Sequence, residues 1–170
     1  MASRYPPSTD QTAFEFLTDE QAAEVEAITA YIIPTDDVAG AREARVVNFL
    51  DRTIADGVFF PWLKNVSLEA LNELQAKVRE KFPSADYFSR LSPDQQLVVL
   101  SDFESWEFFE FFRSVTVFGY LTDPSYGGNY GRSGWAAVAF EDRFAYQPPF
   151  GFYDRDQHGS EGSASRDVGS

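Results

Sequence analysis

The sequence of 170 residues contains no cysteine and only one histidine, His158. Without cysteine, the chain forms no disulfide, performs no thiol chemistry and provides no thiolate ligand for zinc or an iron–sulfur cluster. His158 lies in a stretch rich in Ser, Gly and charge, and a flexible tail rarely holds a preorganised group. A catalytic triad and a histidine metal site are therefore not expected.

Long apolar runs and basic residues are also scarce. No stretch of 18 apolar residues occurs, so no membrane span is expected. Lys and Arg total 14 against 27 Asp and Glu, which gives a formal net charge of −13. This charge repels phosphate backbones and anionic lipid surfaces, so it argues against nucleic acid and membranes as partners.

Aromatic residues are abundant instead and make up 16% of the chain. Because a small domain buries only part of its surface, some of these rings are expected near the surface. Exposed apolar patches usually mark binding sites. The composition therefore predicts a folded domain with an interaction surface.

Apolar periodicity and stop signals predict an all-α fold of about four main helices with a long irregular Gly/aromatic C-terminal segment. Thr18 with Gln21, and Ser92 with Gln95, form capping boxes at two helix starts. Prolines or a glycine follow three of the helices. The helices are expected over residues 18–33, 41–56, about 67–82 and 92–118.

The last of these helices is apolar on nearly all sides, so we expect it to be central or covered by a partner. Its main stripe contains Leu97, Leu100, Phe108, Phe111, Phe112 and Val115. The domain organisation follows from these patterns. Residues 1–16 are an irregular lead-in, residues 17–153 form a single helical domain, and residues 154–170 form a flexible tail.

Three groups of residues are candidates for a chemical site. Asp36 and Asp37 are adjacent in a turn, which is typical of ordinary turn residues, although an acid/base pair or a metal site is the alternative interpretation. Glu104, Glu107 and Glu110 drift around a helix and form no carboxylate row. The glycines of residues 127–131 fit neither the phosphate-binding motif Gly-x-x-x-x-Gly-Lys-Ser/Thr nor the dinucleotide-binding motif Gly-x-Gly-x-x-Gly. No catalytic, metal-binding or cofactor-binding residue is expected in this chain.

The Gly/aromatic loop after residue 119 is the candidate interface. Its glycines allow close backbone approach, and Tyr and Trp are typical interface anchors. The loop can instead fold back on the preceding helix and stabilise the subunit itself. The expected partner-contacting residues are Asp123, Pro124, Tyr126, Gly127, Gly128, Asn129, Tyr130 and Trp135, together with Trp106.

The string Asp123-Pro124-Ser125-Tyr126-Gly127-Gly128-Asn129, followed by Gly134-Trp135, resembles the closing signature of the gluconate 2-dehydrogenase subunit 3 family. The opening is similar to the start of the family, through Leu17-Thr18, Ile32-Ile33-Pro34-Thr35-Asp36 and Val46-Val47-Asn48-Phe49-Leu50-Asp51. The likeness extends over roughly residues 16–140.

The resemblance implies a non-catalytic small subunit of a hetero-oligomeric complex. Its partner would be a large FAD-dependent oxidoreductase of the glucose–methanol–choline type, acting on a sugar or sugar acid, with a cytochrome c as a further component. The small subunit would support stability, maturation and export in a chaperone-like way. Many members carry a twin-arginine signal, and residues 1–10 contain none. A periplasmic location follows if a signal was removed, and a cytoplasmic one follows if the N-terminus is native.

Two other functions stay open at this point. One is a small stand-alone enzyme that uses Asp36, Asp37 and nearby tyrosines, for example a metal-independent isomerase. The other is a general protein-interaction module with a different partner. A large flavoprotein gene beside this one would favour the accessory subunit.

Overall fold

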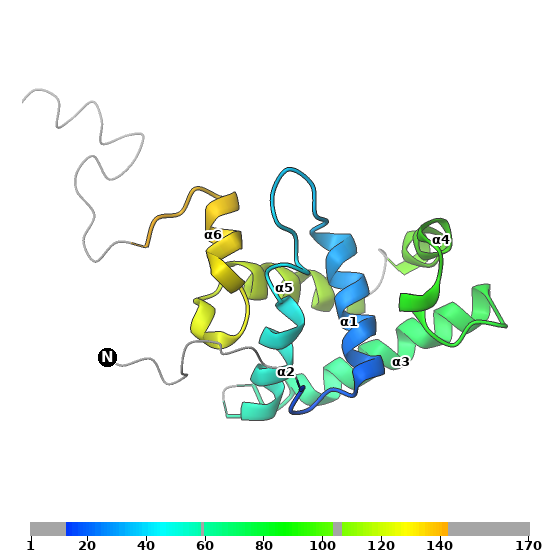
Figure 1. Cartoon of the computed structure of the whole chain (residues 1–170). Coiled ribbons are helices and arrows are strands. Elements are labelled where there is room, and N and C mark those ends of the chain that lie inside the picture. The colour runs from blue at the N-terminus through cyan, green and yellow to red at the C-terminus, as the bar shows by residue number, and fades with distance from the viewer. Residues whose placement is uncertain (1–12, 59, 104–106, 143–170) are drawn as a thin grey trace, which may run out of the picture. The chain divides into compact units, whose positions relative to one another are not determined.

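The computed structural model describes residues 13–58, 60–103 and 107–142 (Figure 1). This part of the chain is helical and contains no strand, which confirms the predicted all-α class. Its α-helices are α1 (Asp19–Ile32), α2 (Val46–Asp56), α3 (Leu63–Lys81), α4 (Pro93–Phe103), α5 (Glu107–Leu121) and α6 (Ser133–Ala137). Three short 3₁₀ turns join them: η1 (Phe88–Arg90), η2 (Pro124–Tyr126) and η3 (Tyr130–Arg132).

The predicted helix signals are present in the structure. Thr18 Oγ1 accepts from the Gln21 amide at 3.2 Å, and Gln21 Oε1 accepts from the Thr18 amide at 3.0 Å. Ser92 and Gln95 make the same reciprocal pair at the start of α4. Gly57 ends α2 with φ of 58°. These contacts satisfy amides that an isolated helix end would leave without partners.

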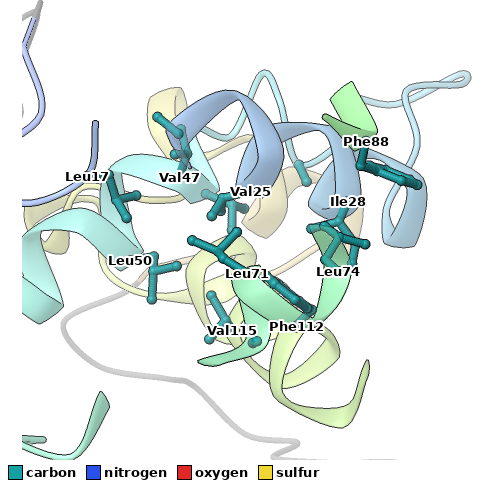
Figure 2. Packing of buried hydrophobic residues seen from close by; sticks show 14 of the residues in the cluster. Leu17, Val25, Ile28, Val47, Leu50, Leu71, Leu74, Phe88, Phe112 and Val115 are labelled. Carbon is teal, nitrogen blue, oxygen red and sulfur yellow. The ribbon is translucent and has the colours of Figure 1, made fainter. Parts of the chain in front are cut away.

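The hydrophobic core gathers around α1, which packs against α2, α3, α5 and η1. Side chains from all of these elements meet in one cluster, as Figure 2 shows. Its fully buried members include Val25, Ile28, Leu50, Leu74, Phe88 and Phe112. Helix α5 crosses both α1 and α2, so it forms the floor on which the C-terminal loop rests.

Two expected helix boundaries are wrong. The third helix begins at Leu63 rather than near Ser67, because the Ser67 hydroxyl donates to the Leu63 carbonyl inside the helix and caps nothing. The single helix expected over residues 92–118 is described as two, α4 and α5, which pack on different neighbours. Leu100 and Phe112 are buried as expected, but Leu97 is 52% exposed.

The compact unit of the fold ends at Phe140. Residues 13–18 precede α1 and form no helix or strand, while most of the expected lead-in over residues 1–16 lies outside the described residues. The expected domain end at residue 153 and the tail over 154–170 lie outside the described residues. None of the described helices is both long and apolar enough to cross a membrane.

Candidate interaction surface

The loop that follows α5 is a chain of tight turns stabilised by short hydrogen bonds. Asp123 Oδ1 accepts from the Ser125 amide at 2.8 Å and so caps η2. Hydrogen bonds from Ser125, first from its side chain and then from its backbone, hold the pKa of the Asp123 carboxyl below its ordinary value. Gly127 then turns the chain with φ of 100°, a conformation that favours glycine.

Asn129 is fully buried and is the structural centre of this loop. Its Oδ1 accepts from the amides of Gly134 at 2.8 Å and Trp135 at 3.3 Å. Its Nδ2 donates to the Thr122 carbonyl at 2.9 Å. The Asn129 side chain therefore joins the start of the loop to the start of α6.

Close backbone contact with the end of α5 explains two glycines of the loop. A Cβ atom on Gly128 would lie 2.1 Å from the Gly119 carbonyl oxygen. A Cβ on Gly134 would lie 1.8 Å from the Tyr120 carbonyl oxygen. Real Cβ atoms do not approach oxygen so closely, so only glycine lets the loop pack here.

The loop's aromatic residues differ in exposure. Trp135 is half-buried, and its Nε1 donates to the Leu121 carbonyl at 2.8 Å. Tyr126 is 46% exposed. Tyr130 is 38% exposed, and the Arg45 guanidinium stacks 3.6 Å from its ring centroid.

The predicted interface residues thus divide into two sets. Gly127, Gly128 and Asn129 are buried and hold the loop on the body of the subunit. Asp123, Tyr126 and Tyr130 face outward and can contact another molecule, while Pro124 and Trp135 are half-buried. Trp106 lies outside the described residues. The structure brings together the described members of the set.

A surface groove that was not predicted adjoins this loop. It consists of two hollows, of about 310 and 280 Å³, which share Phe49, Thr53 and Phe60. We call it the aromatic groove. It runs between α2, the connector that leads to α3, and α5, and its lining also includes Arg52, Asp56, Trp62, Leu63, Phe111, Ser114, Val115, Phe118, Thr122 and Tyr126. Tyr126 is therefore a member of both the loop and the groove.

The sequence carried one signal for the groove, the run Phe59-Phe60-Pro61-Trp62 between two predicted helices. Side chains in a short connector have little room in a core, so a run of this kind indicates surface rings. Phe60 and Trp62 are indeed about half exposed, at 48% and 55%, and their rings meet edge to face at 6.0 Å.

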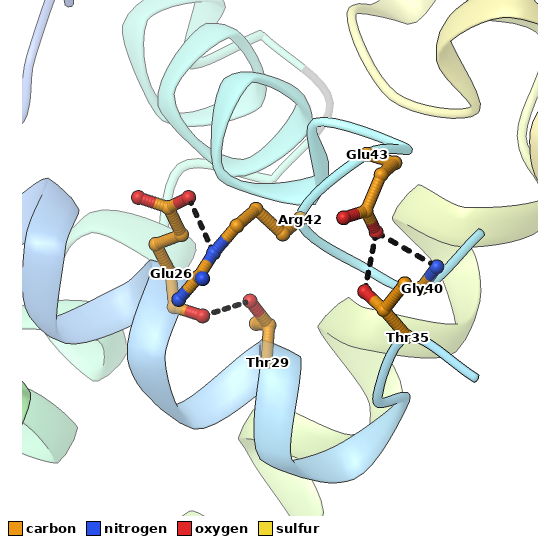
Figure 3. A network of polar contacts seen from close by, with 6 residues as sticks. All are labelled: Glu26, Thr29, Thr35, Gly40, Arg42 and Glu43. Carbon is orange, nitrogen blue, oxygen red and sulfur yellow. Dashed lines mark hydrogen bonds and ion pairs between the residues drawn. The ribbon is translucent and has the colours of Figure 1, made fainter.

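The carboxylates weighed as an acid/base pair occupy a surface turn. Asp36 Oδ1 accepts from the Val38 amide at 3.0 Å, as turn aspartates commonly do. Beside it, Glu43 Oε2 accepts from the Thr35 hydroxyl at 2.7 Å and the Gly40 amide at 2.9 Å (Figure 3). The Thr35 hydroxyl is the largest of the effects that lower the Glu43 pKa. This network closes the turn.

Two buried carboxylates, Asp51 and Glu24, were not predicted from the sequence. Asp51 accepts backbone amides from Glu15, Phe16 and Leu17 at 2.8–2.9 Å. Glu24 accepts those of Phe88 and Ser89 at 2.9 and 2.8 Å. The available signal was an acidic residue within the apolar stripe of a predicted helix, which needs a buried partner. Among the described residues no group of three or more His, Cys, Asp or Glu is arranged to hold a metal ion.

Comparison with known proteins adds one match. The family model for gluconate 2-dehydrogenase subunit 3 matches residues 19–141, a span that includes α1 to α6 and the whole loop. Neither the curated proteins nor the solved structures gave a match. The match covers well over half of the chain. This protein therefore belongs to the gluconate 2-dehydrogenase subunit 3 family.

Proposed function

We propose that this chain is a non-catalytic small subunit that binds and stabilises a large FAD-dependent dehydrogenase of the glucose–methanol–choline type and assists its maturation. The substrate class of that partner is a sugar or sugar acid. FAD resides in the large subunit, and a cytochrome c is a further component of the complex. The family to which the chain belongs is named as a subunit, which supports a role within a larger assembly.

The single observation that carries the proposal is the exposure of aromatic side chains along the aromatic groove. Phe118 is 68% exposed and Trp62 is 55% exposed, although the same protein buries Phe88 and Phe112 completely. Burying apolar surface is worth about 25 cal/mol per Å². Covering these rings with a partner would therefore stabilise the complex, whereas in the isolated chain the rings stay exposed to water.

The carboxylates support a structural role. Asp51 and Glu24 are occupied by backbone amides, and Asp36 and Glu43 close a surface turn. Each of these groups already stabilises the fold. A general acid or base must instead reach a substrate within hydrogen-bond distance.

Co-expression with an FAD-dependent large subunit from the same genome tests the proposal. We expect a tag on the small subunit to retain the large one, and we expect a higher yield and flavin content of the large subunit when both are made together. The small subunit alone should oxidise no sugar. The proposal would be contradicted if the two subunits did not co-purify and the large subunit had the same yield, flavin content and thermal stability with and without the small one.

A further inference from the structure

We propose that the aromatic groove is the docking site for the large subunit, and that it receives an uncharged apolar segment of that subunit flanked by basic residues. This inference rests on the proposed function and adds to it a location and a chemistry of recognition. It also shifts the centre of the interface from the Gly/aromatic loop to the face formed by α2 and α5.

The floor of the groove is rigid. Val115 and Leu63 are nearly buried and belong to the hydrophobic core. The Phe49 ring lies directly over Gly119 of α5, where an added Cβ atom would come within 2.9 Å of Phe49 Cδ1. A preformed floor lowers the ordering cost of binding.

The walls of the groove hold the rings that remain in contact with water. Phe118, Val58 and Trp62 are three of the four most exposed large apolar side chains among the described residues. Phe118 and Trp62 line the groove, and Val58 belongs to the connector that carries Trp62. Phe and Trp side chains that fill pockets contribute much of the binding energy at protein interfaces.

The charge pattern identifies the occupant. The hollow lined by Trp62, Phe111 and Phe118 has no charged residue in its lining, although 24% of the chain is charged. Burying a charge there would leave it unpaired, so the segment that enters the hollow must be uncharged and apolar.

The acidic character of the whole chain favours basic flanks on that segment. Arg52 and Asp56 both line one hollow, and the exposed Asp123 lies next to Thr122, which lines the same hollow. With a net charge of −13 on the whole chain, basic residues beside the apolar segment would be attracted.

The same charge argues against a second copy of this chain as the occupant. Two chains facing each other across their grooves would each carry a net charge of −13 over the whole chain. Like charges at close range weaken association and suppress wrong partners. A different protein that supplies basic residues is the better match.

Substitutions at exposed positions test the docking site without disturbing the core. The probe is the purified FAD-dependent large subunit, and binding of the small subunit is measured by titration at two salt concentrations. Phe118→Glu and Trp62→Ala are compared with Leu97→Glu, a matched control because Leu97 is 52% exposed on α4 and does not line the groove. Circular dichroism and the thermal midpoint of each isolated variant verify that it is folded.

We expect Phe118→Glu and Trp62→Ala to weaken binding by about tenfold or more, since each removes an interface anchor. Leu97→Glu should change the dissociation constant by about twofold at most. Wild-type affinity should fall as salt rises, because screening weakens the attraction between acidic and basic groups.

The other outcomes overturn the inference in distinguishable ways. If the folded groove variants bind like the wild type, the docking site lies elsewhere and the proposed function still stands. If the wild-type chain binds no large subunit, the proposed function fails together with the inference. If sedimentation shows a dimer of the small subunit that Phe118→Glu dissociates while binding to the large subunit is unchanged, the occupant is a second copy.

Discussion

Asn129, Asp51 and Glu24 each bind backbone groups of a different segment of the chain. All three are fully buried polar side chains, and all accept amide hydrogen bonds from loops or turns. A buried polar group is costly unless it is paired, so these side chains and the segments that they hold must be placed together. At the scale of single residues, the loops of this protein are fixed from within by core polar groups.

Removal of the Asn129 side chain is predicted to destabilise the subunit. Asn129→Gly keeps the positive φ of 46° accessible but leaves the Gly134 and Trp135 amides without their acceptor. The expected loss is about 2 kcal/mol or more in the free energy of unfolding, measured by urea denaturation. Asn129→Asp keeps an acceptor for both amides, so its free energy of unfolding should lie between those of the wild type and Asn129→Gly. A wild-type midpoint for Asn129→Gly would contradict the structural role.

The turn closed by Glu43 is predicted to weaken in acid. Hydrogen bonds from Thr35 and from backbone amides lower the Glu43 pKa below 4.5, its ordinary value. A carboxyl group with a depressed pKa stabilises the fold above its ordinary pKa, and this stabilisation is lost as the pH falls through the folded pKa. The Gly40 amide resonance followed by NMR should therefore titrate with a midpoint below 4.5. In Glu43→Gln this titration should disappear, and its persistence would assign it to another group.

At the scale of elements, the sequence predicted helix ends better than helix partners. Both capping boxes, the stop at Pro34 and the cap at Gly57 are local signals, and the structure shows all of them. The apolar run over residues 92–118 gave no indication that α4 packs on α3 while α5 packs on α1 and α2. That choice depends on contacts between distant segments, which periodicity does not encode.

The close packing of the loop on α5 is predicted to require glycine at position 128. Gly128→Ala would place a Cβ atom 2.1 Å from the Gly119 carbonyl oxygen, a clash between two backbones that no rotamer change relieves. We expect a loss of about 2 kcal/mol or more in the free energy of unfolding.

Gly131→Ala is the matched control, because Gly131 has a positive φ but no atom within 4 Å of an added Cβ. It should cost only about 1 kcal/mol, the usual penalty of a left-handed residue. Thermal unfolding of the two variants side by side measures the difference. Equal losses would mean that backbone strain, and not close packing, determines the choice of glycine.

At the scale of the whole molecule, the candidate site was predicted in part. The Gly/aromatic loop was identified as the conspicuous segment, and Tyr126 belongs to both the loop and the aromatic groove. The groove itself was missed, because it arises where Phe49, Phe60 and Phe118 meet from three segments. Residues so far apart in the sequence share no spacing that could mark them as neighbours. Whether the predicted loop residues contact a partner stays a prediction.

The purified chain is predicted to carry no flavin, because we propose that FAD resides in the large subunit. A sample of the isolated small subunit should show the absorbance of its 3 Trp and 8 Tyr residues and no flavin band. The co-purified complex should be yellow, with flavin released in proportion to the large subunit. Flavin in the isolated chain at near one-to-one content would contradict this assignment.

The contact between Glu24 and the turn at Phe88 has a consequence for the order of folding during synthesis. The ribosome makes α1 first. The Phe88 amide, which donates a hydrogen bond to the Glu24 carboxylate, is made 64 residues later. Until it is made, burial of α1 would trap an unpaired carboxylate, so the nascent helix must keep that face hydrated. We therefore expect α1 to reach its buried position only after residue 88 has left the exit tunnel, and α5, which completes the core, follows later still.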